Sequence, residues 1–162
     1  MMGQSMHREI IGASLIALVL LIALMIFRSV RRRRGKQEAI LPNFDSGLID
    51  DVLFDCLYVA TVFVDRPLER VWAYGLGGRG RAVVGTAGMN MVIVRQGERS
   101  ISIPYSSIRQ LVRGGATIDR GVEKSGLIQI DWQLGEANLL TSLRIISNQE
   151  QNYRKLKEAI GV

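Results

Sequence analysis

The chain has 162 residues and carries 21 Lys and Arg against 15 Asp and Glu, which gives a net charge of +6 at pH 7. The excess lies at one end, because residues 37–162 contain 14 basic and 14 acidic residues. A nucleic-acid-binding domain is expected to keep a positive field of its own, so we expect no nucleic-acid partner. A single cysteine and a single histidine exclude an intrachain disulfide and a metal site built from several such ligands.

An uninterrupted apolar segment, IIGASLIALVLLIALMIF, covers residues 10–27 and contains no charged residue. A helix of this length measures about 27 Å, close to the roughly 30 Å of a bilayer's hydrocarbon core. In lipid, only a helix satisfies the backbone polar groups of a single segment. We therefore expect a transmembrane helix over 10–27, preceded by a short extracytoplasmic N-terminus, residues 1–9.

Basic residues are concentrated on the C-terminal side of this segment. Only Arg8 precedes it, whereas six follow it: Arg28, Arg31, Arg32, Arg33, Arg34 and Lys36. The positive-inside rule places the Arg-rich side in the cytoplasm. We expect a single-pass protein of the plasma (inner) membrane, with its N-terminus outside and its C-terminal domain cytoplasmic. A cleaved signal peptide is the alternative, but no A-x-A-like site follows the apolar segment.

The six basic residues form a candidate membrane-surface patch. Each Lys or Arg near an anionic leaflet contributes about 1 kcal/mol of attraction, which makes anionic lipid headgroups expected partners. The other interpretation is that the patch only sets the topology. Residues 28–55 are interpreted as this basic juxtamembrane segment followed by a linker, with a short helix around residues 48–54.

Strand signals begin at Cys56. Residues 57–64 are apolar on both faces, which is typical of a covered strand. A glycine-rich stretch, residues 75–81, is predicted to be a mobile loop. Alternation is clearest where Ile128, Ile130 and Trp132 point inward between polar neighbours. Further strands are predicted at 82–86, 89–95 and 99–103, then after a turn at 108–112, and at 128–134 and 139–145.

The period changes after the last strand. Tyr153, Leu156 and Ile160 fall on one helical face, and Ser147 with Glu150 has the S-x-x-E spacing of a capping box. This pattern predicts a helix over 148–160. We expect residues 56–162 to form a mainly-β domain of about seven antiparallel strands, in a bent sheet or barrel, with a C-terminal capping helix.

This order of elements is similar to the pleckstrin-homology-like (PH-like) fold. Residues 86–108, TAGMNMVIVRQGERSISIPYSSI, resemble a hairpin of bacterial PH-like domains. Residues 126–145, GLIQIDWQLGEANLLTSLRI, resemble small actinobacterial membrane proteins with one N-terminal helix and a PH-like domain, which are often labelled export or transport proteins. The resemblance implies binding of acidic lipid headgroups or protein segments at the rim of strands and loops.

No spacing in the chain points to catalysis, and we expect no catalytic residue, cofactor or metal site. Cys56 is interpreted as a small buried hydrophobe. The candidates for contact with a partner are Trp72, Tyr74, Arg79 and Arg81. The leading hypothesis is a membrane-tethered, non-enzymatic interaction module whose cytoplasmic PH-like domain binds a protein partner or anionic lipid. The alternatives are an accessory subunit of a membrane transport or export complex and an enzyme at the membrane surface.

Overall fold

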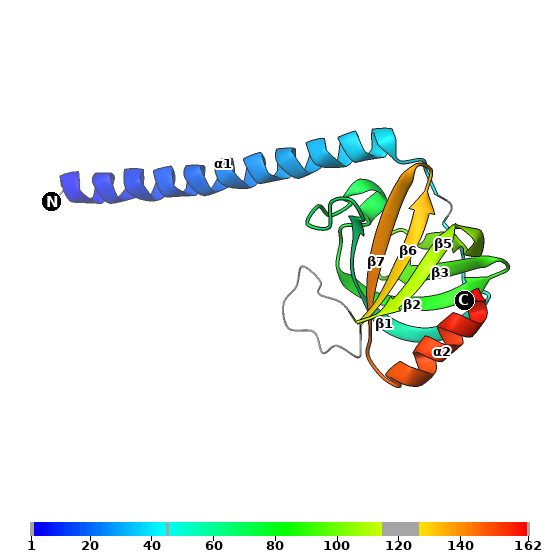
Figure 1. Cartoon of the computed structure of the whole chain (residues 1–162). Coiled ribbons are helices and arrows are strands. Elements are labelled where there is room, and N and C mark those ends of the chain that lie inside the picture. Colours follow the sequence, from blue (N-terminus) through cyan, green and yellow to red (C-terminus); the bar gives the residue numbers. More distant parts are fainter. Residues whose placement is uncertain (1, 45, 115–126, 162) are drawn as a thin grey trace.

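The computed structural model describes residues 2–44, 46–114 and 127–161. A long helix, α1 (Met2–Ile40), projects from a domain made of one bent sheet and a second helix (Figure 1). The other elements follow in chain order: β1 (Asp51–Phe63), η1 (Ala73–Gly75), β2 (Gly80–Ala87), β3 (Asn90–Arg95), β4 (Ile101–Pro104), η2 (Tyr105–Ser107), β5 (Ile108–Arg113), β6 (Leu127–Leu134), β7 (Ala137–Ile145) and α2 (Gln149–Ile160).

The sheet has seven strands in the order β4-β3-β2-β1-β7-β6-β5, and every neighbouring pair is antiparallel. Strand β1 pairs with β2 over residues 51–58 and with β7 over residues 56–63. Its two partners therefore overlap along only a short stretch around Cys56. A register shift between Tyr58 and Ala60 marks a bulge, and bulges bend a strand. The predicted bent antiparallel sheet is confirmed.

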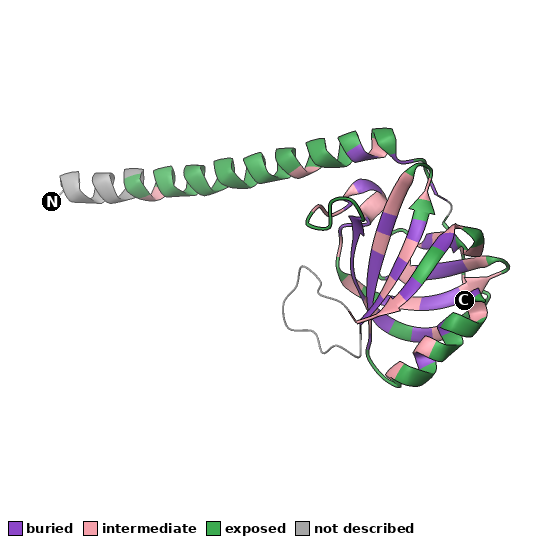
Figure 2. Ribbon diagram, in the orientation of Figure 1, coloured by how far each residue is buried: buried purple, intermediate pink, exposed green. Residues whose placement is uncertain are grey.

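The hydrophobic core joins residues of the sheet to Leu156 and Ile160 of α2, and α2 lies across one end of the sheet (Figures 1 and 2). Ile128, Ile130 and Trp132 are buried, as their alternation predicted. On α2, Leu156 and Ile160 are buried while the charged residues face solvent. The helix thus covers apolar surface that the sheet leaves open, and the predicted C-terminal helix is confirmed.

The predicted helix around residues 48–54 is wrong. Strand β1 begins at Asp51, where it pairs with Thr86 of β2. Just before it, the Asp50 N–H donates to the carbonyl of Thr86. Pairing with a neighbouring strand overrides local preference in so short a segment, and the strand therefore starts five residues before Cys56.

The predicted capping box at the start of α2 is also absent. Asn148 occupies the cap position with φ 49°, and its side chain makes no capping hydrogen bond. The Glu150 carboxylate instead binds Arg113 of β5 at 2.7 Å and Arg154 at 3.2 Å. Arg113 lowers the pKa of Glu150, chiefly by this hydrogen bond. The glutamate therefore ties α2 to the sheet rather than capping its own helix.

Residues 75–81 were predicted to be a mobile loop, but part of this segment packs into the core, and β2 begins at Gly80. Leu76 is fully buried, and its carbonyl accepts a hydrogen bond from the Tyr58 hydroxyl at 2.7 Å. Gly77 lies under the Trp72 ring, where an added Cβ would come within 2.7 Å of Trp72 Cε3. The glycines here allow close packing.

Helix α1 continues well past the predicted end at residue 27. It runs unbroken through the basic segment to Ile40, so the basic segment is helical. The chain that follows is not a free linker either, because Leu41 and Phe44 are buried against the domain. The Ser100 hydroxyl then donates to the carbonyl of Gly47, which holds this segment along β4. This contact could not be predicted from the sequence, because the few apolar residues of the segment do not recur at the spacing of a helix or a strand.

Candidate functional site: the junction between helix α1 and the sheet

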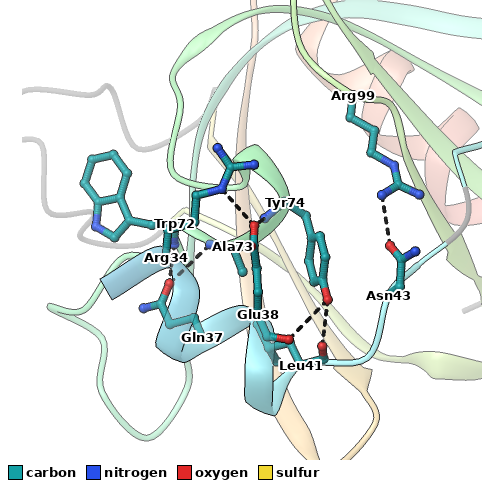
Figure 3. A network of polar contacts seen from close by, with 9 residues as sticks. All are labelled: Arg34, Gln37, Glu38, Leu41, Asn43, Trp72, Ala73, Tyr74 and Arg99. Carbon is teal, nitrogen blue, oxygen red and sulfur yellow. Dashed lines mark hydrogen bonds and ion pairs between the residues drawn. The ribbon is translucent and has the colours of Figure 1, made fainter. Parts of the chain in front are cut away.

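The last turn of α1 meets the segment between β1 and β2 that contains η1 (Figure 3). Here an apolar helix that projects alone becomes part of the folded domain. The candidate membrane-surface patch lies immediately before this contact along the same helix. We therefore take the junction, with the patch, as the candidate functional site.

Gln37 makes the central polar contact of the junction, and the residue is only 6% exposed. Its amide oxygen accepts the backbone N–H groups of Trp72 at 2.6 Å and Ala73 at 3.2 Å. Its amide nitrogen donates to the carbonyl of Arg70 at 3.1 Å and to the carboxylate of Glu69 at 3.3 Å. All four hydrogen-bonding positions of the amide are thus used. A buried amide with complete partners fixes the orientation of the helix.

Glu38 and Tyr74 make the second contact. Glu38 Oε1 accepts from Arg34 Nε at 2.8 Å and from the Tyr74 N–H at 3.2 Å. The Tyr74 hydroxyl lies 2.9 Å from the carbonyl oxygen of Leu41, to which it donates, and 3.4 Å from that of Glu38. The last carbonyls of a helix lack partners within the helix. The Tyr74 hydroxyl supplies a hydrogen-bond donor from the domain to the carbonyls at this end of α1.

Tyr74 has a left-handed backbone, with φ 52° and ψ 25°. This conformation costs a non-glycine residue roughly 1–3 kcal/mol. Its ring packs edge-on against Phe44, with centroids 5.4 Å apart. The hydrogen bonds to α1 and this aromatic contact offset the backbone cost, and they place the tyrosine against the helix.

A buried hydrogen-bond chain connects the segment around η1 to the centre of the sheet. Trp132 Nε1 donates to the Thr141 hydroxyl at 2.9 Å, and that hydroxyl lies 2.8 Å from the hydroxyl of Thr61. Thr61 lies 2.6 Å from the hydroxyl of Tyr58, which donates to the carbonyl of Leu76. The surface that receives α1 is therefore held by the core itself. Burial raises the pKa of Tyr58 to about 12, so its hydroxyl stays a donor.

Two arginines complete the junction. Arg95, which is buried, donates from Nη1 to the carbonyl of Gly75 at 2.6 Å, and its guanidinium lies over the Tyr58 ring. Arg99 donates to Asn43 Oδ1 at 2.9 Å and to the carbonyl of Phe44 at 2.7 Å. The arginines thus hold the η1 segment and the chain after α1 on the same domain.

The structure brings two of the four candidate contact residues to the junction, Trp72 and Tyr74. Arg79 is exposed before β2. Arg81 lies on β2 and lines a cavity of about 640 Å³ with Asp55 and Ile146. The four therefore do not form one surface, and their role as partner contacts stays a prediction. The sequence analysis did not identify Gln37 or Leu41 as contact residues. Both lie in the segment interpreted as a juxtamembrane region and linker, where no pattern indicates a buried side chain.

The basic patch keeps its position along α1. All six side chains are exposed: Arg28, Arg31, Arg32, Arg33, Arg34 and Lys36. Four consecutive residues of a helix point in all directions, because successive side chains are about 100° apart. The patch thus surrounds the helix as a belt, a geometry suited to a ring of headgroups around a membrane helix.

Reactive chemistry has little support in the part of the chain that is described. Cys56 is buried, and desolvation raises the pKa of its thiol to about 12. It is therefore protonated at neutral pH and a poor nucleophile. Within residues 11–44, 46–114 and 127–161, whose side chains the structure describes, no three His, Cys, Asp or Glu side chains gather where they could hold a metal ion.

A family profile places the domain among known proteins. The profile described as Bacterial PH domain-like matches residues 39–161, from the last turn of α1 to the end of α2. No protein with a curated description matches the chain. PH-like domains are generally binding modules rather than catalysts. The matched region has seven antiparallel strands and a C-terminal helix, as that fold requires. The chain belongs to the Bacterial PH domain-like family.

Proposed function

We propose that this chain is a membrane-tethered, non-enzymatic interaction module. Helix α1 crosses the plasma (inner) membrane, and the PH-like domain works on the cytoplasmic side, where it binds a protein partner or anionic lipid headgroups at the inner leaflet. One observation carries the proposal: a single unbroken helix joins an uncovered apolar segment to a buried polar joint in a PH-like domain.

The uncovered apolar surface supports the membrane role. Twelve large apolar side chains between residues 11 and 27 are exposed, and none of the most apolar window of α1 is buried. Exposure to water costs on the order of 1 kcal/mol for each such side chain. A helix from the core of a soluble protein would be covered by its own fold, and this one projects clear of the domain (Figure 2). Lipid is the solvent that this surface fits.

The belt of basic residues supports the proposed orientation. Its six cations follow the apolar segment directly, while Arg8 is the only basic residue before it. Lys and Arg resist transfer across the bilayer, so the domain stays on the side of the belt. The joint then holds the domain close to the headgroups, since Gln37 follows Arg28 by about 14 Å along the helix axis.

Two experiments with the full chain test the proposal. The chain is reconstituted into nanodiscs, and binding of anionic lipid is compared with binding of zwitterionic lipid. Cross-linking in cells, followed by purification in detergent, identifies neighbouring proteins. Enrichment of anionic lipid or a stoichiometric protein partner supports the module. Absence of both overturns it. Co-purification with a polytopic transport protein would favour an accessory subunit of a transport or export complex.

A further inference from the structure

A second part of the domain lies at the level of the basic belt. The loop after β1 reaches α1, and one cavity of about 540 Å³ is lined by Arg33 from the helix and by Arg66, Pro67, Leu68 and Glu69 from the loop. Leu68 is 85% exposed. A leucine so exposed at the tip of a loop lacks cover from the domain, and this one lies beside the basic segment of α1.

The height of this loop follows from the helix. Arg33 lies six residues after Phe27, the last residue of the apolar segment, or about 9 Å along the axis. Centring the segment in the hydrocarbon core puts Arg33 roughly 7–8 Å beyond its boundary, while one headgroup layer is roughly 5–8 Å deep. The residues beside Arg33 therefore lie in or against the headgroups.

The cation of the loop tip, Arg66, is paired within the loop. Arg66 binds Asp65 at 3.2 Å and Glu69 at 2.9 Å, and its guanidinium stacks 4.6 Å from the centroid of the Phe63 ring. Arg66 is thus engaged within the loop, which leaves Pro67 and Leu68 as an apolar tip. Such an apolar tip fits the interfacial layer of a membrane better than it fits a charged protein surface.

We propose that Leu68, with Pro67 beside it, inserts into the interfacial layer of the leaflet that α1 leaves, so that the domain touches the bilayer at a second point. This inference rests on the proposed membrane anchoring of α1. Its occupant is the bilayer itself, because the loop lies against the helix that crosses it, beside Arg33 and Gln37. Since the tip is apolar and its cation, Arg66, is paired within the loop, the contact does not require anionic lipid. The basic belt, by contrast, does.

The chain offers a matched control for Leu68. Leu48 is also 85% exposed, but it precedes β1 whereas Leu68 follows it, so the two leucines lie at opposite ends of the 13-residue strand. Cys56 is buried with its thiol protonated, so a new surface cysteine should be labelled selectively. Labelling of the chain without a new cysteine is the control.

The test attaches an environment-sensitive fluorophore to Leu68→Cys, Leu48→Cys and Phe27→Cys in the full chain, reconstituted into phosphatidylcholine vesicles. Nitroxide-labelled lipids with the spin label near the headgroup serve as quenchers, and circular dichroism checks folding. We expect strong quenching and a blue-shifted emission at positions 27 and 68, and little change at position 48. Adding phosphatidylglycerol should leave the signal at position 68 unchanged.

The outcomes separate the two claims. Quenching at position 27 with equal, weak signals at 68 and 48 would overturn the second contact but leave the anchor intact. Equal, strong quenching at 68 and 48 would also overturn it, because the domain would then lie on the membrane without orientation. No quenching at position 27 would overturn the anchoring of α1 itself.

Discussion

Helix α1 has an uncovered apolar part and a part that is packed against the domain, and one continuous backbone joins the two. Residues 11–27 present apolar side chains that the described part of the domain leaves uncovered, whereas Gln37 has four polar contacts and almost no exposure. The apolar side chains of residues 11–27 favour contact with lipid, whereas the hydrogen bonds of Gln37 fix the helix against the domain. An anchor joined by a loose linker would leave its domain free to rotate, but this arrangement transmits the position of the helix to the sheet.

The largest expected effect comes from placing charged residues in the apolar segment, residues 11–27. The double substitution Leu18→Arg, Ile22→Arg places two cations at the centre of the segment, where each costs about 3 kcal/mol of insertion free energy. We expect the chain to lose stable membrane insertion, measured by resistance to alkaline carbonate extraction. The pair Leu18→Ala, Ile22→Ala is the control. Retention of the arginine variant in the membrane would contradict the anchor.

Removing part of the belt should weaken the contact with anionic lipid. Arg31→Gln, Arg32→Gln and Arg33→Gln together remove about 3 kcal/mol of attraction to an anionic leaflet and spare the Arg34–Glu38 pair. Energy transfer from tryptophan to labelled phosphatidylglycerol should fall, and its salt dependence should flatten. Lys155→Gln with Lys157→Gln on α2 serves as the control. An equal loss in that control would mean that the attraction is not specific to the belt.

Gln37 tests the other end of the helix. Gln37→Ala leaves the buried N–H groups of Trp72 and Ala73 without their acceptor, which costs about 2–3 kcal/mol in the free energy of unfolding. Chemical denaturation of the full chain in detergent measures it. The neighbouring Lys36→Ala, on the exposed side, should change little. Equal stability of the two variants would show that the joint does not hold the domain.

A smaller effect is expected from the hydroxyl that reaches α1. Tyr74→Phe keeps the ring against Phe44 but removes the donor to the carbonyl of Leu41, which costs roughly 1 kcal/mol of unfolding free energy. Tyr153→Phe on α2 is the control. Denaturation curves for the two variants should differ by that amount, and coincident curves would assign no value to this hydrogen bond.

The smallest effect near neutral pH concerns Cys56 and Tyr58. Burial raises both pKa values to about 12, from 9.0 for the thiol and 10.0 for the phenol. A raised pKa in an acid means that the stability it contributes is complete below the unfolded value and is lost as pH rises through the folded value. Stability should therefore be flat up to pH 9 and fall between 9 and 12, and the thiol should resist alkylation at pH 8. Fast alkylation of the folded chain would contradict the burial.

The sheet and α2 were predictable because each repeats a pattern along the chain. The alternation around Trp132 and the helical spacing of Leu156 and Ile160 come from burial on one face, which the sequence displays directly. The junction could not be predicted in the same way, because Gln37 is buried by a segment more than thirty residues away. A single polar residue with partners distant in sequence leaves no period.

Two local signals also misled for the same reason. The S-x-x-E spacing at Ser147 predicts a capping box, but Arg113 of β5 binds the glutamate more directly. The acidic stretch before Cys56 suggests a short helix, but pairing with β2 makes Asp51 the start of a strand. In both cases a partner distant in sequence decides the local structure.

The accessibility of a cysteine at position 48 tests the central claim most directly. In cells that express Leu48→Cys, a membrane-impermeant maleimide should label the chain only after the inner membrane is permeabilised, and the full-length chain should sediment with the membrane fraction. Labelling of intact spheroplasts, or a full-length chain in the soluble fraction, would contradict an anchored domain on the cytoplasmic side.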